Sequence, residues 1–311
     1  MIFMKEKQKI FPASIITLVM AVSCLVILSA TTVTAADPPP LTVGGVYSAG
    51  MNPFIPLWDY NPDTDPHVFH DPDNPGKYRL YLFNSHDLRT TAYCGTNEVL
   101  WSAPVEDLTQ WTYHGVIVDQ SIHQGTNNDI FFAPTACEVD NGDGTYTYYY
   151  IPFSQGGGRA SMMLKADRPD GPYTVINWNG ASRTQTTGAS WNFDPALFVD
   201  DDGRMYGFWG GYSSAITGAE LDPAAPYNIK PGTSSVQVAP LYSQTNGSAL
   251  SVFEAVALSK MTIDGHTKYV MTYARRGLSG EPWGTTSAMK AYATSDNPLG
   301  PYEYGGPLVY A

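Results

Sequence analysis

Short apolar strands separated by turn residues dominate the chain after its first 36 residues, where no long window has the periodicity of a helix. Four segments share one pattern: an acidic or proline-marked start, a short apolar strand, a turn of Asp, Asn and Gly, and an aromatic strand. They start 68, 61 and 60 residues apart, at Asp65, Ala133, Asp194 and Glu254. This pattern predicts four β-hairpins.

Each hairpin is followed by a third strand and an outer strand, and the element D-x-P-x-G-P-Y occurs at both Asp167–Tyr173 and Asp296–Tyr302. A four-stranded unit of about 60 residues is typical of a propeller blade. A two-sheet sandwich also has short strands, but it predicts no such long period. We therefore expect an all-β propeller over residues 51–311, preceded by a linker at residues 37–50.

Residues 1–36 have the features of a secretory signal peptide. A lysine-bearing start is followed by an apolar run at Ile15–Ala30 and then by small residues. A membrane anchor is the alternative, but the run is shorter than the ~20 residues that a spanning helix needs. We expect a secreted protein, extracellular or periplasmic, with no membrane association after cleavage.

Composition and charge narrow the class of partner. The formal net charge is −12, and such an acidic protein would repel nucleic acid and anionic membranes. Neutral polymers such as polysaccharides remain compatible, and we expect a monomer. Removal of the signal peptide leaves two cysteines, Cys94 and Cys137. A disulfide between them is not expected, since free buried cysteine is common, but pairing stays open.

The repeat also predicts a site, because the first strand of every propeller blade lines the central channel. Three of the four equivalent positions, Asp65, Asp194 and Glu254, then direct carboxylates into one cavity. Either Asp-Pro pair alone could simply begin a strand, but chance is a poor explanation for carboxylates at three equivalent positions. Three other acidic runs lie where a hairpin needs a turn, and we interpret them as solvated turns rather than calcium loops: Asp71–Gly76, Asp140–Gly144 and Asp200–Gly203.

Four motifs, in their order and spacing, resemble glycoside hydrolase family 43: TDPHVF, FFAPTA, FDPALFVDDDG and VFEAVALSK. The stretches LFNSHD and VLWSAPVEDLTQW are similar to members that act as exo-acting α-L-arabinofuranosidases or β-xylosidases on plant cell-wall polysaccharides. The resemblance implies a five-bladed propeller that hydrolyses with inversion. It also implies Asp65 as general base, Glu254 as general acid and Asp194 as the residue that tunes the pKa of the acid.

Candidate sugar-binding residues are Trp191, Trp101 and Trp283, whose ring faces could pack against a sugar, and His86 at the end of a strand. Core packing is at least as good an interpretation for each tryptophan, and a structural role for the histidine. An endo-arabinanase and a non-catalytic carbohydrate-binding propeller remain alternatives. Whether arabinose or xylose is released stays open, as does whether the enzyme removes single end units or cuts within the polymer.

The resemblance also implies a fifth blade, whose His helps organise the channel and often a bound calcium or sodium ion. No repeat follows the fourth, and His266 lies in a predicted hairpin turn. We therefore expect an incomplete ring with little activity as written, and no required cofactor.

Overall fold

The computed structural model of the chain describes residues that all belong to one compact unit, Thr42–Ala311. The described residues are 43–44, 55, 60–87, 95–123, 130–154, 162–178, 186–191, 193–243, 248–263, 265–282, 284–286 and 288–310. The predicted signal peptide, Cys94 and Trp283 lie outside them. Within the described residues no helix is both long and apolar enough to cross a bilayer.

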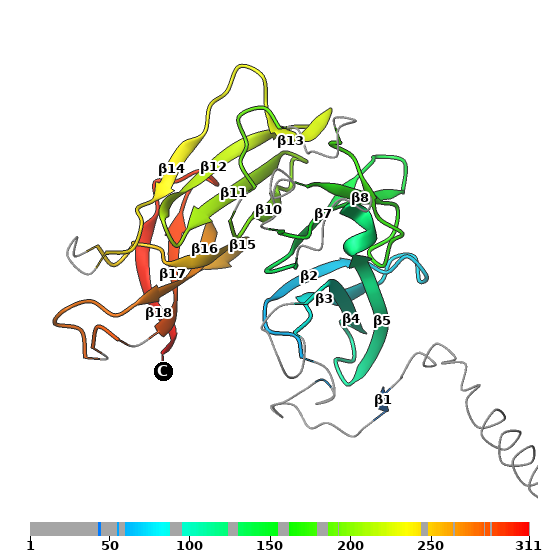
Figure 1. Cartoon of the computed structure of the whole chain (residues 1–311), viewed down its shortest axis with the longest axis horizontal. Coiled ribbons are helices and arrows are strands. Elements are labelled where there is room, and N and C mark those ends of the chain that lie inside the picture. The colour runs from blue at the N-terminus through cyan, green and yellow to red at the C-terminus, as the bar shows by residue number, and fades with distance from the viewer. Residues whose placement is uncertain are drawn as a thin grey trace, which may run out of the picture. The chain divides into compact units, whose positions relative to one another are not determined.

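Four antiparallel sheets follow one another along the chain and form the blades of a β-propeller (Figure 1). Blade 1 comprises β2 (Thr64–His70), β3 (Tyr78–Ser85), β4 (Asn97–Pro104) and β5 (Gln110–Asp119). Blade 2 comprises β6 (Thr135–Asp140), β7 (Tyr146–Ile151), β8 (Leu164–Ala166) and β9 (Thr174–Val175). The four-hairpin prediction is confirmed.

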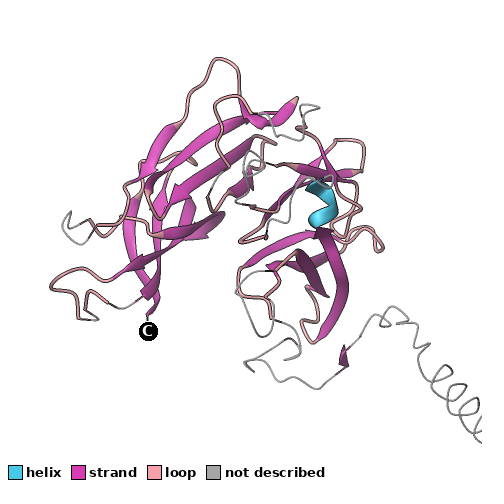
Figure 2. Cartoon of the chain, viewed as in Figure 1, coloured by secondary structure: helices cyan, strands magenta, loops and turns pink. Residues whose placement is uncertain are grey.

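Blade 3 comprises β10 (Ala196–Val199), β11 (Met205–Gly211), β12 (Ser214–Asp222), β13 (Ala225–Ile229) and β14 (Val236–Ala239), the last two both pairing with β12. Blade 4 comprises β15 (Glu254–Ile263), β16 (His266–Arg276), β17 (Ala288–Ser295) and β18 (Glu303–Tyr310). A 3₁₀ helix, η1 (Gln120–His123), follows β5 and is the helical element among the described residues (Figure 2).

Part of the predicted linker is itself a strand. The two residues of β1 (Val43–Gly44) pair antiparallel with Trp111 and Gln110 of β5, so β1 becomes a fifth strand of blade 1. Pairing at this edge covers the hydrogen-bonding groups of an outer strand.

The apolar cores lie between neighbouring blades. Phe83 and Leu100 of blade 1 pack with Tyr150 of blade 2, and Phe208 of blade 3 packs with Tyr273 of blade 4. The inner strands are in contact in the order β2, β6, β10, β15. Among the described strands, those of blades 1 and 4 share no apolar core cluster. The described residues thus contain four blades that surround a common centre in chain order.

The acidic turns are only partly solvated, which corrects the expectation from the sequence. Asp71 and Asp200 are buried. Asp200 accepts hydrogen bonds from Lys260 Nζ at 2.6 Å and Tyr269 Oη at 2.5 Å, both on blade 4. A buried carboxylate is stable when it is paired and hydrogen-bonded, so this turn joins blade 3 to blade 4. The repeat pattern could not reveal this partner.

Among the described residues, Cys137 is buried and free. Its candidate partner Cys94 lies outside the described residues, so their pairing stays open.

Candidate active site

A cavity of about 580 Å³ lies where the first strands of the four blades begin. The three predicted carboxylates, Asp65, Asp194 and Glu254, all line it, together with Ala133 at the fourth equivalent position. The repeat therefore predicted their convergence correctly. Equivalent positions of successive blades reach the same end of the channel because the inner strands run in the same direction.

The side chain of Asp194 contacts the backbone directly after Glu254. Asp194 has φ 35° and Ala255, directly after Glu254, has φ 57°. Both values are uncommon for residues other than glycine, and such conformations concentrate at functional sites. The N–H of Ala255 donates to Asp194 Oδ2 at 2.9 Å. This contact holds the start of blade 4 against the Asp194 carboxyl group.

Asp65 is held in a different way. Its Oδ2 accepts the backbone N–H of Ala136 at 3.0 Å and lies 2.6 Å from Nε2 of His67. One carboxylate oxygen is thus already engaged by blade 2 and by a side chain of its own strand. His67 also lines the cavity.

A fourth carboxylate, Asp63, was missed in the sequence and lines the same cavity. The hydroxyl of Ser85 donates to Asp63 Oδ2 at 3.0 Å, and the Asp63 N–H donates to Ser85 Oγ at 3.3 Å. Removal from water raises the pKa of Asp63, and the charge of Asp87 raises it further. The sequence contained a usable signal, because residues 63 and 65 lie on one side of an extended chain.

Burial and mutual repulsion raise the pKa values in this cavity. Burial, followed by the charges of Glu254 and Asp63, raises the pKa of Asp194 to about 6 against the lowering effect of the Ala255 N–H. Burial raises the pKa of Glu254, and the charge of Asp63 adds to it. Asp63 is therefore the carboxylate of blade 1 that acts electrostatically on both of the other groups. Such shifts are typical of sites that must hold or move a proton.

Lys290, on β17, supplies a cation to the same cavity. Desolvation lowers the pKa of its ammonium group, and the charges of Asp194, Glu254 and Asp63 oppose that effect. A cation among several carboxylates offsets part of their repulsion. The sequence analysis did not identify it, because nothing in the repeat relates a third strand to the channel.

The predicted sugar platforms are corrected. Trp191 and Trp101 are fully buried, so neither ring is available to a sugar. Trp191 Nε1 donates to the carbonyl of Tyr227 at 3.3 Å. Both indoles fill space within or between sheets, the alternative that the sequence had left open.

His86 is also outside the cavity lining, and its Nδ1 lies 2.6 Å from Asn97 Oδ1 in blade 1. Among the described residues no group of three or more His, Cys, Asp or Glu is arranged to hold a metal ion.

Comparison with known proteins places this geometry in a family. The profile of "Glycosyl hydrolases family 43" matches residues 64–308. The "Xylosidase/arabinosidase" of Thermoclostridium stercorarium is 28% identical over 268 residues, covering 83% of this chain and 52% of that protein. The "Arabinoxylan arabinofuranohydrolase" of Bacillus subtilis (strain 168) is 28% identical over 272 residues, covering 79% and 51%. The chain spans about half the length of these relatives.

A solved structure has the same fold. The GH43_1 enzyme from Xanthomonas citri, determined in complex with xylose, superposes with a TM-score of 0.56 at 20% identity, covering 82% of this chain and 76% of the other. The profile match covers most of the propeller, including Asp65 in β2, Glu254 at the start of β15, and Asp194 just before β10. The chain belongs to glycoside hydrolase family 43.

Proposed function

We propose that this protein is a secreted, inverting glycoside hydrolase that removes arabinose or xylose units from plant cell-wall polysaccharides. The observation that carries the proposal is the single cavity in which Asp63, Asp194 and Glu254 interact and hold their protons more tightly than usual. The printed activities of the relatives, a xylosidase/arabinosidase and an arabinoxylan arabinofuranohydrolase, support this substrate class.

Glu254 is the proposed general acid. Its raised pKa favours the protonated form that can donate to the glycosidic oxygen as the bond to the anomeric carbon breaks. A base on the opposite side takes a proton from water, whose oxygen forms the new bond to that carbon. Inversion needs about 6.5 to 9.5 Å between the two carboxyl groups, so that the water fits.

We propose Asp65 as this base, the residue to which the sequence pointed. Asp65 Oδ2 is held by the Ala136 N–H and by His67, which leaves Oδ1 of that carboxylate for the water. Asp63 instead acts through its charge, which raises the pKa values of Glu254 and Asp194. A carboxylate that must accept a proton needs an oxygen directed at the water. Asp194 and Lys290 then set the charge around the acid.

An endo-arabinanase would use the same groups, so the carboxylates do not separate it from an exo-acting arabinofuranosidase or xylosidase. A non-catalytic sugar-binding propeller is less well supported. It has no need for several carboxyl groups whose pKa values are raised by burial and repulsion, since these cost stability at neutral pH.

The test is hydrolysis by the full chain and by Glu254→Gln, with the nitrophenyl α-L-arabinofuranoside, the nitrophenyl β-xyloside and linear arabinan as substrates. The four-blade repeat predicts a low rate, but we expect measurable release from at least one substrate by the full chain, and at least about 100-fold less by the variant. Proton NMR of the first product should show the inverted anomer. Equal rates for the two proteins, or a retained anomer, would contradict the proposal.

The pH profile tests the role of Asp194. The charge of Glu254 raises the pKa of Asp194, and because the interaction is mutual, ionised Asp194 raises the pKa of Glu254. Asp194→Asn removes that charge, so the pKa of Glu254 falls and the basic limb of kcat/KM against pH moves to lower pH. Asp296→Asn, at an exposed site on blade 4, is the control. A limb that stays in place would show that Asp194 acts by another route.

A further inference from the structure

A second cavity, of about 530 Å³, lies at the hairpin ends of blades 1 and 2. It is lined by residues that include His70, Asp71, Asn141, Tyr146, Tyr148 and Asp167. The strand β2 (Thr64–His70) connects the two cavities, with Asp65 near one end and His70 at the other. Seven strand residues span about 20 Å, so the second cavity is separate from the hydrolytic one.

Aromatic rings form one wall of this cavity. The ring of His70 stacks on Tyr146, with centroids 4.0 Å apart and planes at 19°, and its centroid lies 4.6 Å from that of Tyr78. Tyr78 is not part of the cavity lining, whereas the lining rings of His70 and Tyr146 are half-buried and reach the surface. Flat rings at a surface are the side chains against which the apolar C–H face of a sugar can pack, while polar atoms stay wet.

The polar groups next to these rings have hydrogen-bond partners within the protein, and these hydrogen bonds hold the wall in place. Glu138 accepts hydrogen bonds from the His70 N–H at 2.9 Å and the Tyr148 hydroxyl at 2.8 Å, and its Oε1 lies 2.7 Å from His70 Nδ1. Because these groups bond to one another, the wall of the cavity needs no ligand for its own stability, and the rings are held in one arrangement.

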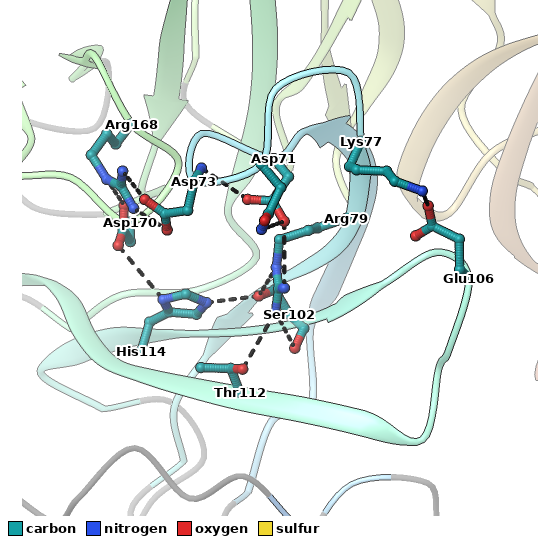
Figure 3. Close-up of polar contacts among 11 residues, drawn as sticks. Asp71, Asp73, Lys77, Arg79, Ser102, Glu106, Thr112, His114, Arg168 and Asp170 are labelled. Carbon is teal, nitrogen blue, oxygen red and sulfur yellow. Dashed lines mark hydrogen bonds and ion pairs between the residues drawn. The ribbon is translucent and has the colours of Figure 1, made fainter.

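Ion pairs hold the rim of the cavity, as Figure 3 shows for the contacts between blades 1 and 2. Arg168, next to Asp167 of the lining, donates to both oxygens of Asp73 at 2.9 and 3.0 Å and to Asp170 at 3.0 Å. Asp73 belongs to the β2–β3 turn that contributes Asp71 and Pro72 to the cavity. A preformed cavity binds with a smaller ordering cost.

The available polar chemistry matches a neutral, hydroxyl-rich ligand. Asp167 is exposed, and its carboxylate has no hydrogen-bond or ion-pair partner among the described residues. A carboxylate can accept strong hydrogen bonds from sugar hydroxyls. Anionic ligands are disfavoured by Asp71, Asp167 and the net charge of −12, and the described part of the chain has no metal-binding cluster here.

We propose that this cavity is a second carbohydrate-binding site, which holds a sugar unit of a neutral polysaccharide while the distant cavity hydrolyses another part of the same polymer. The class of polymer rests on the proposed function. The existence of the site rests on the stacked rings, the unpaired Asp167 carboxylate and the ion pairs of Arg168 at the rim. Tyr146 supplies the packing surface and Asp167 accepts from hydroxyls. Polymer affinity then depends on residues that a small substrate never touches.

The experiment uses the full chain with Glu254→Gln as background, so that binding is measured without turnover. Retention is measured by affinity electrophoresis in gels that contain wheat arabinoxylan, linear arabinan or anionic polygalacturonate. We expect retention by at least one neutral polymer, at least about tenfold weaker binding after Tyr146→Ala, and a smaller loss after Asp167→Ala. Tyr146→Phe keeps the ring and should bind like the background protein.

Two further readouts separate this site from folding and from catalysis. Asp296→Ala is the matched control for Asp167→Ala, because Asp296 begins the same D-x-P-x-G-P-Y element in blade 4. In a protein that keeps Glu254, Tyr146→Ala should change nitrophenyl glycoside turnover by no more than about twofold. Its thermal midpoint should stay within a few degrees of that of the unchanged protein.

The outcomes are distinct for the two proposals. Unchanged retention of Tyr146→Ala, no retention of the background protein on either neutral polymer, or equal Tyr146-dependent retention on polygalacturonate overturns the second site. Retention that depends on Tyr146, in a protein that hydrolyses none of the substrates, supports the site and contradicts the hydrolase proposal instead.

Discussion

Asp65→Asn is expected to lower kcat on a nitrophenyl glycoside by about 100-fold or more, and Asp63→Asn by much less. Loss of a positioned general base usually costs 10²- to 10⁴-fold. Asp63 acts through its charge on Asp194 and Glu254, so its replacement removes no reacting group. An Asn at position 65 can still accept the Ala136 N–H, so the local backbone contact survives the change.

Azide gives a sharper measurement for the same pair of variants. It is a nucleophile that carries no proton to remove, so it needs no base. With azide present, Asp65→Asn should regain turnover and form a glycosyl azide, while Asp63→Asn should respond little. The reverse pattern, with the large loss and the rescue both in Asp63→Asn, would assign the base to Asp63 instead.

Trp191→Ala is expected to lower the free energy of unfolding by about 3 to 5 kcal/mol, the usual range for removal of a large buried aromatic side chain. The Trp191 ring is fully buried and lies edge-on to Trp209, with centroids 5.2 Å apart. A Cβ on Gly207 would overlap it, which indicates how closely the backbone of β11 approaches the indole. The loss thus comes from a cavity between blades 2 and 3.

Urea unfolding followed by circular dichroism measures this effect, with KM on a nitrophenyl glycoside as the second readout. Trp191→Phe should lose less stability, because it keeps part of the buried surface. A raised KM with unchanged stability in Trp191→Ala would instead mean that the indole contacts sugar, as the sequence had suggested.

Buried groups outside the strand pattern were the hardest to predict. Asp71 and Asp200 occupy turns, where an acidic residue is normally solvated, yet both are buried. For Asp200 the partner, Lys260, is 60 residues away on the next blade. No local rule identifies such a pair, because it forms only when two hairpins pack side by side. The signal peptide, secretion and the monomeric state remain predictions.

The sequence by itself determined the repeated hairpins, the propeller class and the convergence of Asp65, Asp194 and Glu254. These follow from short-range physics: alternation builds strands, Asp, Asn and Gly build turns, and equivalent repeat positions reach the same end of a channel. The tertiary structure alone decided that Asp63 and Lys290 join the cavity and that Trp101 and Trp191 do not face it. Burial and the distance between charges depend on how separate blades pack, and those contacts join residues far apart in the chain.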